Sequence, residues 1–199
     1  SQALHAWFAH VPGLRVVMPS SVADARDLLI AAVLCKDPVM YIDDRWLYHR
    51  EDALPPIVEL DLAAEGPRCL QPGTDLTIVG AGYSAYLAVQ AAESLRAQHV
   101  SSEVIDLRVL NPFEPGVIVE SVRKTGRLLV VDGGWRTAGF AGEVVASVVE
   151  RVELSDLKRA PVRLTLPDAP APTSRVLEKT YYATVADVVD AALRLTGPK

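Results

Sequence analysis

From Leu76 onward, short apolar runs of strand length alternate regularly with amphipathic segments of helix length. Alternation of this kind predicts right-handed β-α-β crossovers, whose helices cover both faces of a parallel sheet. The sequence therefore predicts an α/β domain for this part of the chain. The predicted strands are 76–80, 103–107, 127–132 and 162–166, and the predicted helices are 83–98, 115–124, 138–153 and 185–195.

A shorter pattern of the same type comes before it. Ser21, with Asp24 three residues later, is a capping signal for an amphipathic helix. A strand on each side of that helix gives β-α-β order with a parallel character. The predicted elements are a helix over 1–10 with Leu4, Trp7 and Phe8 on one face, a strand over 14–18, a helix through Ala25 to Val33, and a strand over 39–42.

Proline and glycine punctuate the stretch between these two patterns, which is typical of an interdomain linker. We therefore expect an N-terminal part over 1–60, a linker over 61–73, and a C-terminal domain over 74–199. The chain lacks an initial Met and opens inside a predicted helix. This start predicts that the sequence is a piece of a longer protein.

The composition is that of an ordinary globular protein, since half of the 199 residues are hydrophobic and 23% are charged. A net charge of -5 argues against a nucleic-acid partner, which usually requires a basic face. No apolar run approaches the length of a membrane span. The two cysteines, Cys35 and Cys69, form no C-x-x-C pair, so we expect reduced thiols and a cytoplasmic location.

One glycine motif stands where a nucleotide site would require it. Residues 80–85 fit G-x-G-x-x-[G/A] between a predicted strand and a predicted helix, and Asp106 ends the next strand. Glycines allow a pyrophosphate to approach the backbone closely, and the helix N-terminus attracts its charge. The alternative is a plain tight turn that binds nothing. Four strands, rather than the six of the full dinucleotide fold, favour the plain turn.

The remaining candidate residues form no catalytic constellation. His5, His10, His49 and His99 make no metal-binding spacing. His99 is predicted to be solvent-exposed, whereas His5 and His10 either face a cofactor or, as we favour, make structural hydrogen bonds. The 43–45 Asp-Asp-Arg sequence could supply paired carboxylates for acid-base chemistry, but a salt bridge at a strand end is the favoured interpretation.

Several longer motifs resemble one family, the beta subunits of pyruvate and branched-chain 2-oxoacid dehydrogenases. SQALHAWFAHVPGLRVVMPSSVADARDLLIAAV and DPVMYIDDRWLY resemble the second half of the pyrimidine-binding domain of thiamine-diphosphate enzymes. VIDLRVLNPFEP, VRKTGRLLVVDGGWRTAGFAGEV and PDAPAPTSRVLEKTYYATVADVV resemble their transketolase-type C-terminal domain. The resemblance covers nearly the whole chain in the right order. It implies a mostly parallel sheet in each of these two regions.

The resemblance implies 2-oxoacid decarboxylation or two-carbon acyl or ketol transfer, with a carbanion stabilised by thiamine diphosphate. In that family the active-site histidine immediately precedes the pair that matches Ser1 and Gln2, and the diphosphate and its magnesium are held by another domain or subunit. No catalytic residue is therefore expected here, and the chain alone is expected to be inactive. The glycine turn of the family's C-terminal domain serves folding and assembly.

The resemblance also implies partners and an ion. The partners are an alpha-type subunit or domain that carries the diphosphate site, a second beta copy, and an acyltransferase or carrier component. A potassium ion held mostly by backbone carbonyls corresponds to Ala32, Val33, Cys35 and Asp37, although a carboxylate is usual where Cys35 stands. Departures at 132–134, Ala138 and Leu166 indicate a divergent member.

Overall fold

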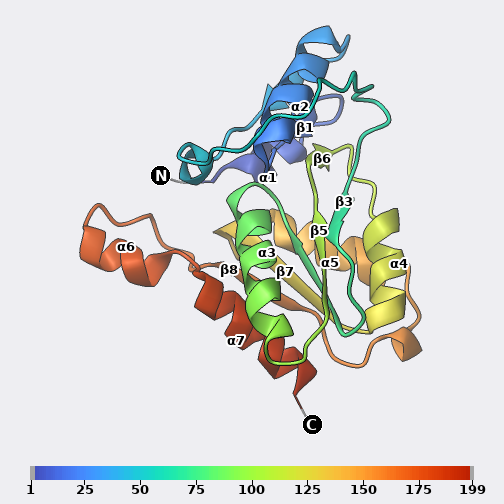
Figure 1. Cartoon of the computed structure of the whole chain (residues 1–199), viewed down its shortest axis with the longest axis vertical. Helices are drawn as coiled ribbons and strands as arrows, with labels where there is room; N and C mark the ends of the chain where they lie inside the picture. The colour runs from blue at the N-terminus through green and yellow to red at the C-terminus, as the bar shows by residue number, and fades with distance from the viewer. Residues whose placement is uncertain (1–2, 198–199) are drawn as a thin grey trace.

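Five strands form the central sheet of the C-terminal domain in the computed structural model, which describes residues 3–197 (Figure 1). Their order is β3-β5-β4-β7-β8, and the last four in that order run parallel. The edge strand β3 is antiparallel to β5. The predicted α/β fold with a mostly parallel sheet is thus confirmed. The strands are β3 (Arg68–Gln71), β4 (Leu76–Gly80), β5 (Ser102–Asp106), β7 (Leu128–Trp135) and β8 (Val162–Leu166).

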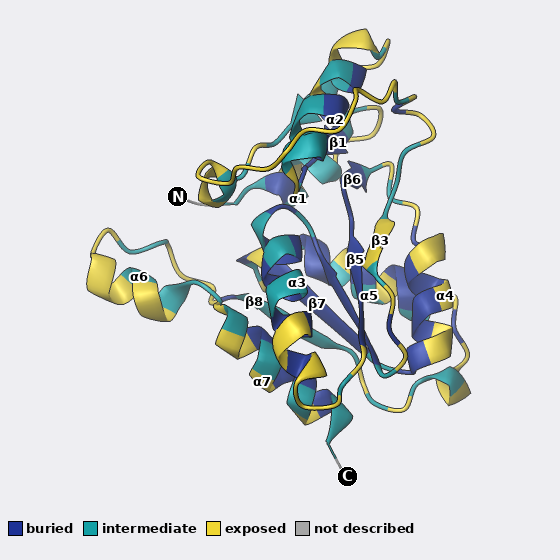
Figure 2. Cartoon of the chain, in the orientation of Figure 1, coloured by how far each residue is buried: buried dark blue, intermediate teal, exposed yellow. Residues whose placement is uncertain are grey.

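Helices cover both faces of this sheet, because successive strand residues point to opposite sides. Ile78 packs in the cluster formed with α3 (Tyr83–Arg96) and α7 (Val185–Thr196), whereas its neighbour Val79 packs in the cluster formed with α4 (Gly116–Thr125) and α5 (Phe140–Val149). Every residue of β4 and β5 is buried (Figure 2). These strands are therefore shielded from solvent on both faces, as expected of a doubly covered parallel sheet.

The N-terminal part forms a second, smaller sheet of order β2-β1-β6. Strand β1 (Arg15–Val17) is parallel to β2 (Val39–Tyr41) and antiparallel to β6 (Val109–Asn111). Strand β6 directly follows β5, so the C-terminal half of the chain supplies one edge of the N-terminal sheet. Helix α2 (Val22–Leu34) begins at Ser21, whose hydroxyl accepts the Asp24 N–H as predicted from the capping signal.

Some elements differ from the sequence-based expectation. The linker predicted over 61–73 contains β3, so its last residues pair with the C-terminal sheet. Helix α1 (His5–Ala9) was expected to place Trp7 on its inner face, but Trp7 is 70% exposed and His5 is buried. The short helix α6 (Arg175–Tyr181), which was not predicted, buries no residue and projects from the body of the molecule (Figure 1).

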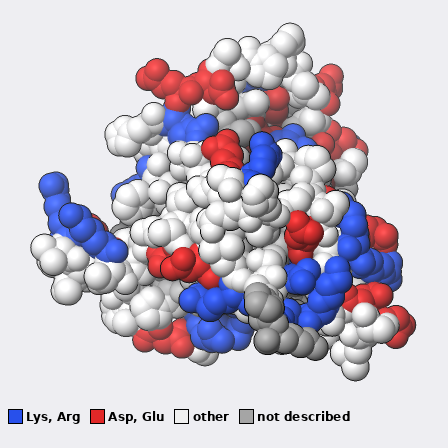
Figure 3. Space-filling model, turned by 60° about the horizontal axis from the view of Figure 1, so that its bottom comes forward, with Lys and Arg blue, Asp and Glu red and all other residues white. Residues whose placement is uncertain are grey.

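Short 3-10 turns complete the chain at η1 (Arg45–Leu47) and η2 (Leu154–Asp156). None of the helices within residues 3–197 is long and apolar enough to cross a membrane. On the face shown in Figure 3, Lys and Arg side chains are interspersed with Asp and Glu side chains.

Candidate functional site

The glycine turn at the start of α3 is filled by residues of the N-terminal part. Gly82 has a φ of +52°, and a Cβ there would lie 2.7 Å from Met18 Cε. The Asp44 carboxylate accepts the Tyr83 N–H at 3.1 Å and so caps the helix N-terminus. A carboxylate of the chain itself therefore occupies the position that a nucleotide phosphate would need. The plain-turn alternative is the one the structure supports, and the turn joins the two parts of the chain.

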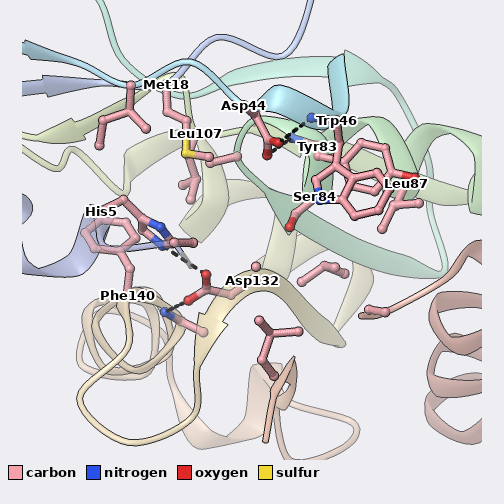
Figure 4. A pocket seen from close by; sticks show the side chains of 18 of the residues that line it. His5, Met18, Asp44, Trp46, Tyr83, Ser84, Leu87, Leu107, Asp132 and Phe140 are labelled. Atoms are coloured by element: carbon pink, nitrogen blue, oxygen red, sulfur yellow. Dashed lines mark hydrogen bonds and ion pairs between the residues drawn. The ribbon is translucent and has the colours of Figure 1, made fainter. Parts of the chain in front are cut away.

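A cavity of about 520 Å³ lies beside this turn, between α1, the segment that links β2 to η1, and the carboxyl ends of β4 and β7 (Figure 4). The chain continues from β4 to one neighbouring strand and returns through β7 on the other side. Open α/β sheets bind ligands at such a switch point. The fold alone thus makes this cavity the first place to look for function.

A histidine-carboxylate pair forms the base of the cavity. His5 Nε2 lies 2.9 Å from Asp132 Oδ1, and both side chains are buried. Asp132 also accepts the Gly134 N–H at 2.8 Å and the Ala141 N–H at 2.9 Å. Burial by itself would raise the pKa of Asp132, but the hydrogen bond from His5 and the two backbone N–H groups hold it below its usual value. His5 was predicted to make a structural hydrogen bond, and it does so.

Aromatic side chains form the opposite wall. The Trp46 ring stacks on Tyr83 with centroids 5.6 Å apart, and it meets Tyr182 edge-on at 5.5 Å. Tyr83 in turn stacks on Tyr86, over which the Arg50 guanidinium lies at 4.5 Å from the ring centroid. Rings from η1, α3 and the segment before α7 therefore meet at one side of the cavity. Ring contacts of this kind stabilise the junction beyond their buried area.

Buried charges form a second junction between the two parts of the chain. The Arg108 guanidinium, 4% exposed, pairs with Asp24 at 3.0 Å and with Glu65, and Arg68 also pairs with Asp24. The nearby Asp106 carboxylate accepts the Ser20 hydroxyl and the Arg108 backbone N–H. These groups come from the N-terminal part, the predicted linker and the C-terminal sheet. They were not predicted as a group, because their sequence separations reach 86 residues.

Burial is the main reason that Asp106 titrates unusually. It raises the pKa of Asp106 to about 6, with a further rise from the Asp24 charge, while the Ser20 hydroxyl and Arg108 oppose it. The side chain is completely buried. The nucleotide alternative, which used Asp106 at the end of the strand after the glycine motif, does not fit this position, since both carboxylate oxygens accept from the chain's own Ser20 and Arg108.

The other predicted residues lie apart from the cavity or serve local structure. His10, His49 and His99 are exposed, as was predicted for His99. The salt bridge predicted within 43–45 is not found among residues 3–197. Instead the Asp44 carboxylate accepts the Trp46 and Tyr83 N–H groups, and Asp43 accepts the Tyr48 hydroxyl. Short carboxylates after a strand here cap the following turns, which their residue type also permits.

The predicted potassium ligands lie at the end of α2. The helix ends at Cys35, whose N–H donates to the Ala31 carbonyl, and the carbonyls of Ala32 and Val33 belong to the last turn. The last carbonyls of a helix lack intrahelical partners and can coordinate a hard cation. Asp37, in contrast, pairs with Arg15 at 2.8 Å. Within the described part of the chain, no cluster of three His, Cys, Asp or Glu side chains could hold a metal.

These features define an α/β domain with an N-terminal sheet fastened to the carboxyl edge of its central sheet, and comparison with known proteins places it in a family. The domain family described as Transketolase, C-terminal domain matches residues 67–188. The chain belongs to this family.

Curated relatives extend the match over almost the entire chain. It is 37% identical over 193 residues to "Pyruvate dehydrogenase E1 component subunit beta" of Rhizobium meliloti, covering 96% of this chain and 41% of that protein. It is 36% identical over 202 residues to "2-oxoisovalerate dehydrogenase subunit beta" of Bacillus subtilis, covering 98% and 59%. The chain thus spans about half the length of the curated relatives it matches.

A solved structure shares the fold. "Split gene transketolase, inactive beta4 tetramer" superposes with a TM-score of 0.73 at 25% identity, covering 96% of this chain and 60% of that one. The sequence-based resemblance to beta subunits with a transketolase C-terminal domain is thereby confirmed.

Proposed function

We propose that the chain forms the C-terminal part of a beta-type subunit in a thiamine-diphosphate enzyme, either a 2-oxoacid dehydrogenase or a transketolase-like enzyme. The observation that carries this proposal is the similarity of nearly the whole chain, through both sheets, to beta subunits of 2-oxoacid dehydrogenases. The relatives are about twice as long as the chain. The chemistry is therefore proposed for the assembly and not for this polypeptide alone.

The residues of this chain do not fit the diphosphate end of the cofactor. A diphosphate-magnesium site needs oxygen ligands and free N–H groups. At the one helix start with the matching motif, Asp44 takes the N–H and Met18 fills the space. The chemistry supplied by bound thiamine diphosphate is addition to a carbonyl and stabilisation of the carbanion. We assign its binding, with magnesium, to another domain or subunit.

The role left for this chain is to hold two domains and their partners in position. The Arg108 cluster and the His5-Asp132 pair fasten α1 and α2 to the C-terminal sheet. The proposed partners are an alpha-type subunit or domain, a second beta copy, and an acyltransferase or carrier component. Helix α6, which buries none of its residues, is one surface available to them. The division into 1–60, 61–73 and 74–199 and the cytoplasmic location remain predictions.

The test is reconstitution. The chain, with the upstream sequence that its gene encodes and with an alpha-type subunit, is expected to bind thiamine diphosphate and to turn over a 2-oxoacid or ketose. Fluorescence titration measures the binding, and release of carbon dioxide or transfer to a dye measures the turnover. The chain alone is the control and is expected to do neither. A complete assembly that binds no cofactor would instead favour a non-catalytic assembly module.

The potassium site at Ala32, Val33, Cys35 and Asp37 is proposed on the free carbonyls at the end of α2. Binding with a dissociation constant near 10 mM would raise the free energy of unfolding by roughly 1.4 kcal/mol in 100 mM KCl. NaCl of the same concentration is the control. Equal stabilisation by the two salts would contradict a potassium site. If the site exists, Cys35→Asp is expected to raise its affinity for potassium.

A further inference from the structure

Acceptor groups dominate the polar lining of the cavity beside the glycine turn. Three carboxylates line it, from Asp43, Asp44 and Asp132, against a single guanidinium from Arg45. The Asp44 and Asp132 carboxylates are already bonded to backbone N–H groups, but they keep their negative charge inside a partly apolar space. Such a lining favours a positively charged occupant and repels an anion.

His5 adds an acceptor with no partner. Its Nε2 faces the Asp132 carboxylate at 2.9 Å, so this nitrogen carries the proton and donates it to the carboxylate. Nδ1 then presents a lone pair. Within residues 3–197 it has no hydrogen-bond partner, although the side chain is only 4% exposed. A buried acceptor left unpaired is destabilising, and a hydrogen-bond donor from a ligand would remove that cost.

The apolar and aromatic walls of the cavity indicate what the uncharged part of a ligand would be. Leu87, Phe140 and Leu107 contribute apolar surface, and the stacked Trp46 and Tyr83 rings close the side opposite His5 (Figure 4). Aromatic faces attract cations as well as apolar groups. The volume of about 520 Å³ is in the range of small-molecule sites. An amphipathic molecule fits these walls better than a fully hydrated ion.

We propose that this cavity binds a small organic cation, an ammonium or amidinium group on an apolar stem, whose N–H donates to His5 Nδ1 while its charge lies near Asp43 and the Trp46 ring. This site is independent of the proposed diphosphate chemistry, since no group of the cavity takes part in it. The charge separates this ligand class from nucleotides, carboxylates and phosphates, and the closed helix start at Tyr83 excludes the same anions.

The experiment titrates the chain with three matched probes by calorimetry: 2-phenylethylammonium, the neutral 2-phenylethanol and the anionic phenylacetate. We expect measurable binding of the cation, weaker binding of the alcohol and none of the anion. Equal binding of cation and alcohol, or binding of the anion, would overturn the proposal. The same titrations on the reconstituted assembly show whether the cavity takes a free cationic ligand or a basic side chain of a partner. Binding to the chain alone but not to the assembly would show that a partner's basic side chain fills the cavity, which also overturns it.

Variants locate the site. Asp43→Asn removes the charge of an exposed carboxylate. It is expected to lower the affinity for the cation roughly fivefold and to leave the affinity for the alcohol unchanged. Trp46→Ala is expected to lower the affinity for both the cation and the alcohol by roughly tenfold. Trp7→Ala removes an exposed tryptophan that does not line this cavity, and it is the matched control with unchanged affinity. If Trp7→Ala and Trp46→Ala weakened binding equally, the ligand would lie elsewhere.

A spectroscopic readout tests the contact with His5 directly. The ¹⁵N resonance of His5 Nδ1 is expected to shift on addition of 2-phenylethylammonium, because the lone pair becomes a hydrogen-bond acceptor. The resonances of His10, His49 and His99, which do not line the cavity, are internal controls and should not move. A ligand-induced shift in all four histidines, or in none, would contradict the proposed contact.

Discussion

The two sheets of this chain differ in how much of their own core they carry. The C-terminal sheet has five strands, and helices bury it on both faces. The N-terminal sheet has three strands of three residues each, and every residue of its edge strand β2 is only partly buried. Its core cluster has five buried members, Val17, Leu28, Ala31, Leu62 and Val109, two of which lie beyond residue 60.

The N-terminal part therefore depends on the C-terminal domain for its structure. Small sheets are marginal unless a hydrophobic face packs on something else. Here β6 supplies an edge strand, Met18 and Asp44 pack on the glycine turn, and Arg108 pairs with Asp24. A loop with the pattern of a ligand-binding turn is thus the surface on which the N-terminal part packs. The following experiments test this dependence.

Two core substitutions, one in each sheet region, should differ in how much of the chain they destabilise. Ile78→Ala, in the central strand β4, is expected to lower the free energy of unfolding of the entire chain by about 4 kcal/mol, because it leaves a cavity in a fully buried layer. Leu28→Ala is expected to destabilise mainly α2. Amide exchange over 22–34 should accelerate by roughly a hundredfold, which corresponds to about 3 kcal/mol, while β4 and α3 keep their protection.

Leu29→Ala is the matched control for Leu28→Ala, since Leu29 lies on the same helix and is 47% exposed. Its exchange pattern should match that of the unmodified chain. If Leu28→Ala reduced the protection of β4 as much as that of α2, the two parts would unfold as one unit. The proposed dependence would then run in both directions.

Arg108→Ala removes the ion pairs that join the two parts. Asp24 would lose a buried partner and Glu65 would lose its ion pair, so we expect a loss of about 3 kcal/mol in the free energy of unfolding. Urea titration monitored by tryptophan fluorescence measures it. Arg123→Ala breaks an exposed pair with Glu120 and should cost less than about 0.5 kcal/mol. Equal losses for the two variants would mean that Arg108 does not couple the parts.

The sequence predicted the C-terminal domain well and the junction poorly, for a physical reason. Strands β4 and β7 contain buried apolar runs, β5 contains the buried pair Val104 and Ile105, and apolar residues alternate with polar ones in β8, so the local sequence identifies all four. Strand β3 contains Arg68 and Gln71 and is largely exposed, and α6 buries nothing, so neither shows a periodic apolar pattern. Their structure comes from pairing and from neighbours.

The candidate site was harder still to predict, because its contacts join residues that are far apart in the sequence. Helical periodicity placed Trp7 inward, but the buried residue of α1 is His5, because Asp132 lies opposite it 127 positions later. Likewise, the pattern at 80–85 was compatible with a nucleotide until Asp44 was seen at the helix start. Single-sequence patterns report which side chains prefer burial. They do not report which partner a polar side chain will find.

The smallest expected effect concerns Asp106, which lies where the two parts meet. Its pKa is raised to about 6 in the folded chain, so the folded state binds a proton more tightly than the unfolded state does. The stability that this proton confers is present at pH 4 and is lost as the pH rises through 6. The difference from the ordinary aspartate pKa of 3.8 corresponds to an upper bound of about 3 kcal/mol for this contribution.

Asp106→Asn keeps the shape but carries no charge at any pH; its amide oxygen can accept the Arg108 N–H while its NH2 donates to the Ser20 hydroxyl oxygen. We therefore expect the variant to exceed the unmodified chain by about 1–2 kcal/mol at pH 8, with the difference shrinking toward pH 4.5. Urea unfolding at the two pH values measures this. Asp132 titrates in the opposite sense, but it is present in both proteins and cancels. Asp52→Asn, at an exposed position, is the control. A constant difference between Asp106→Asn and the unmodified chain at all pH values would show that the Asp106 charge is already compensated by Arg108, and the junction would then be fully paired.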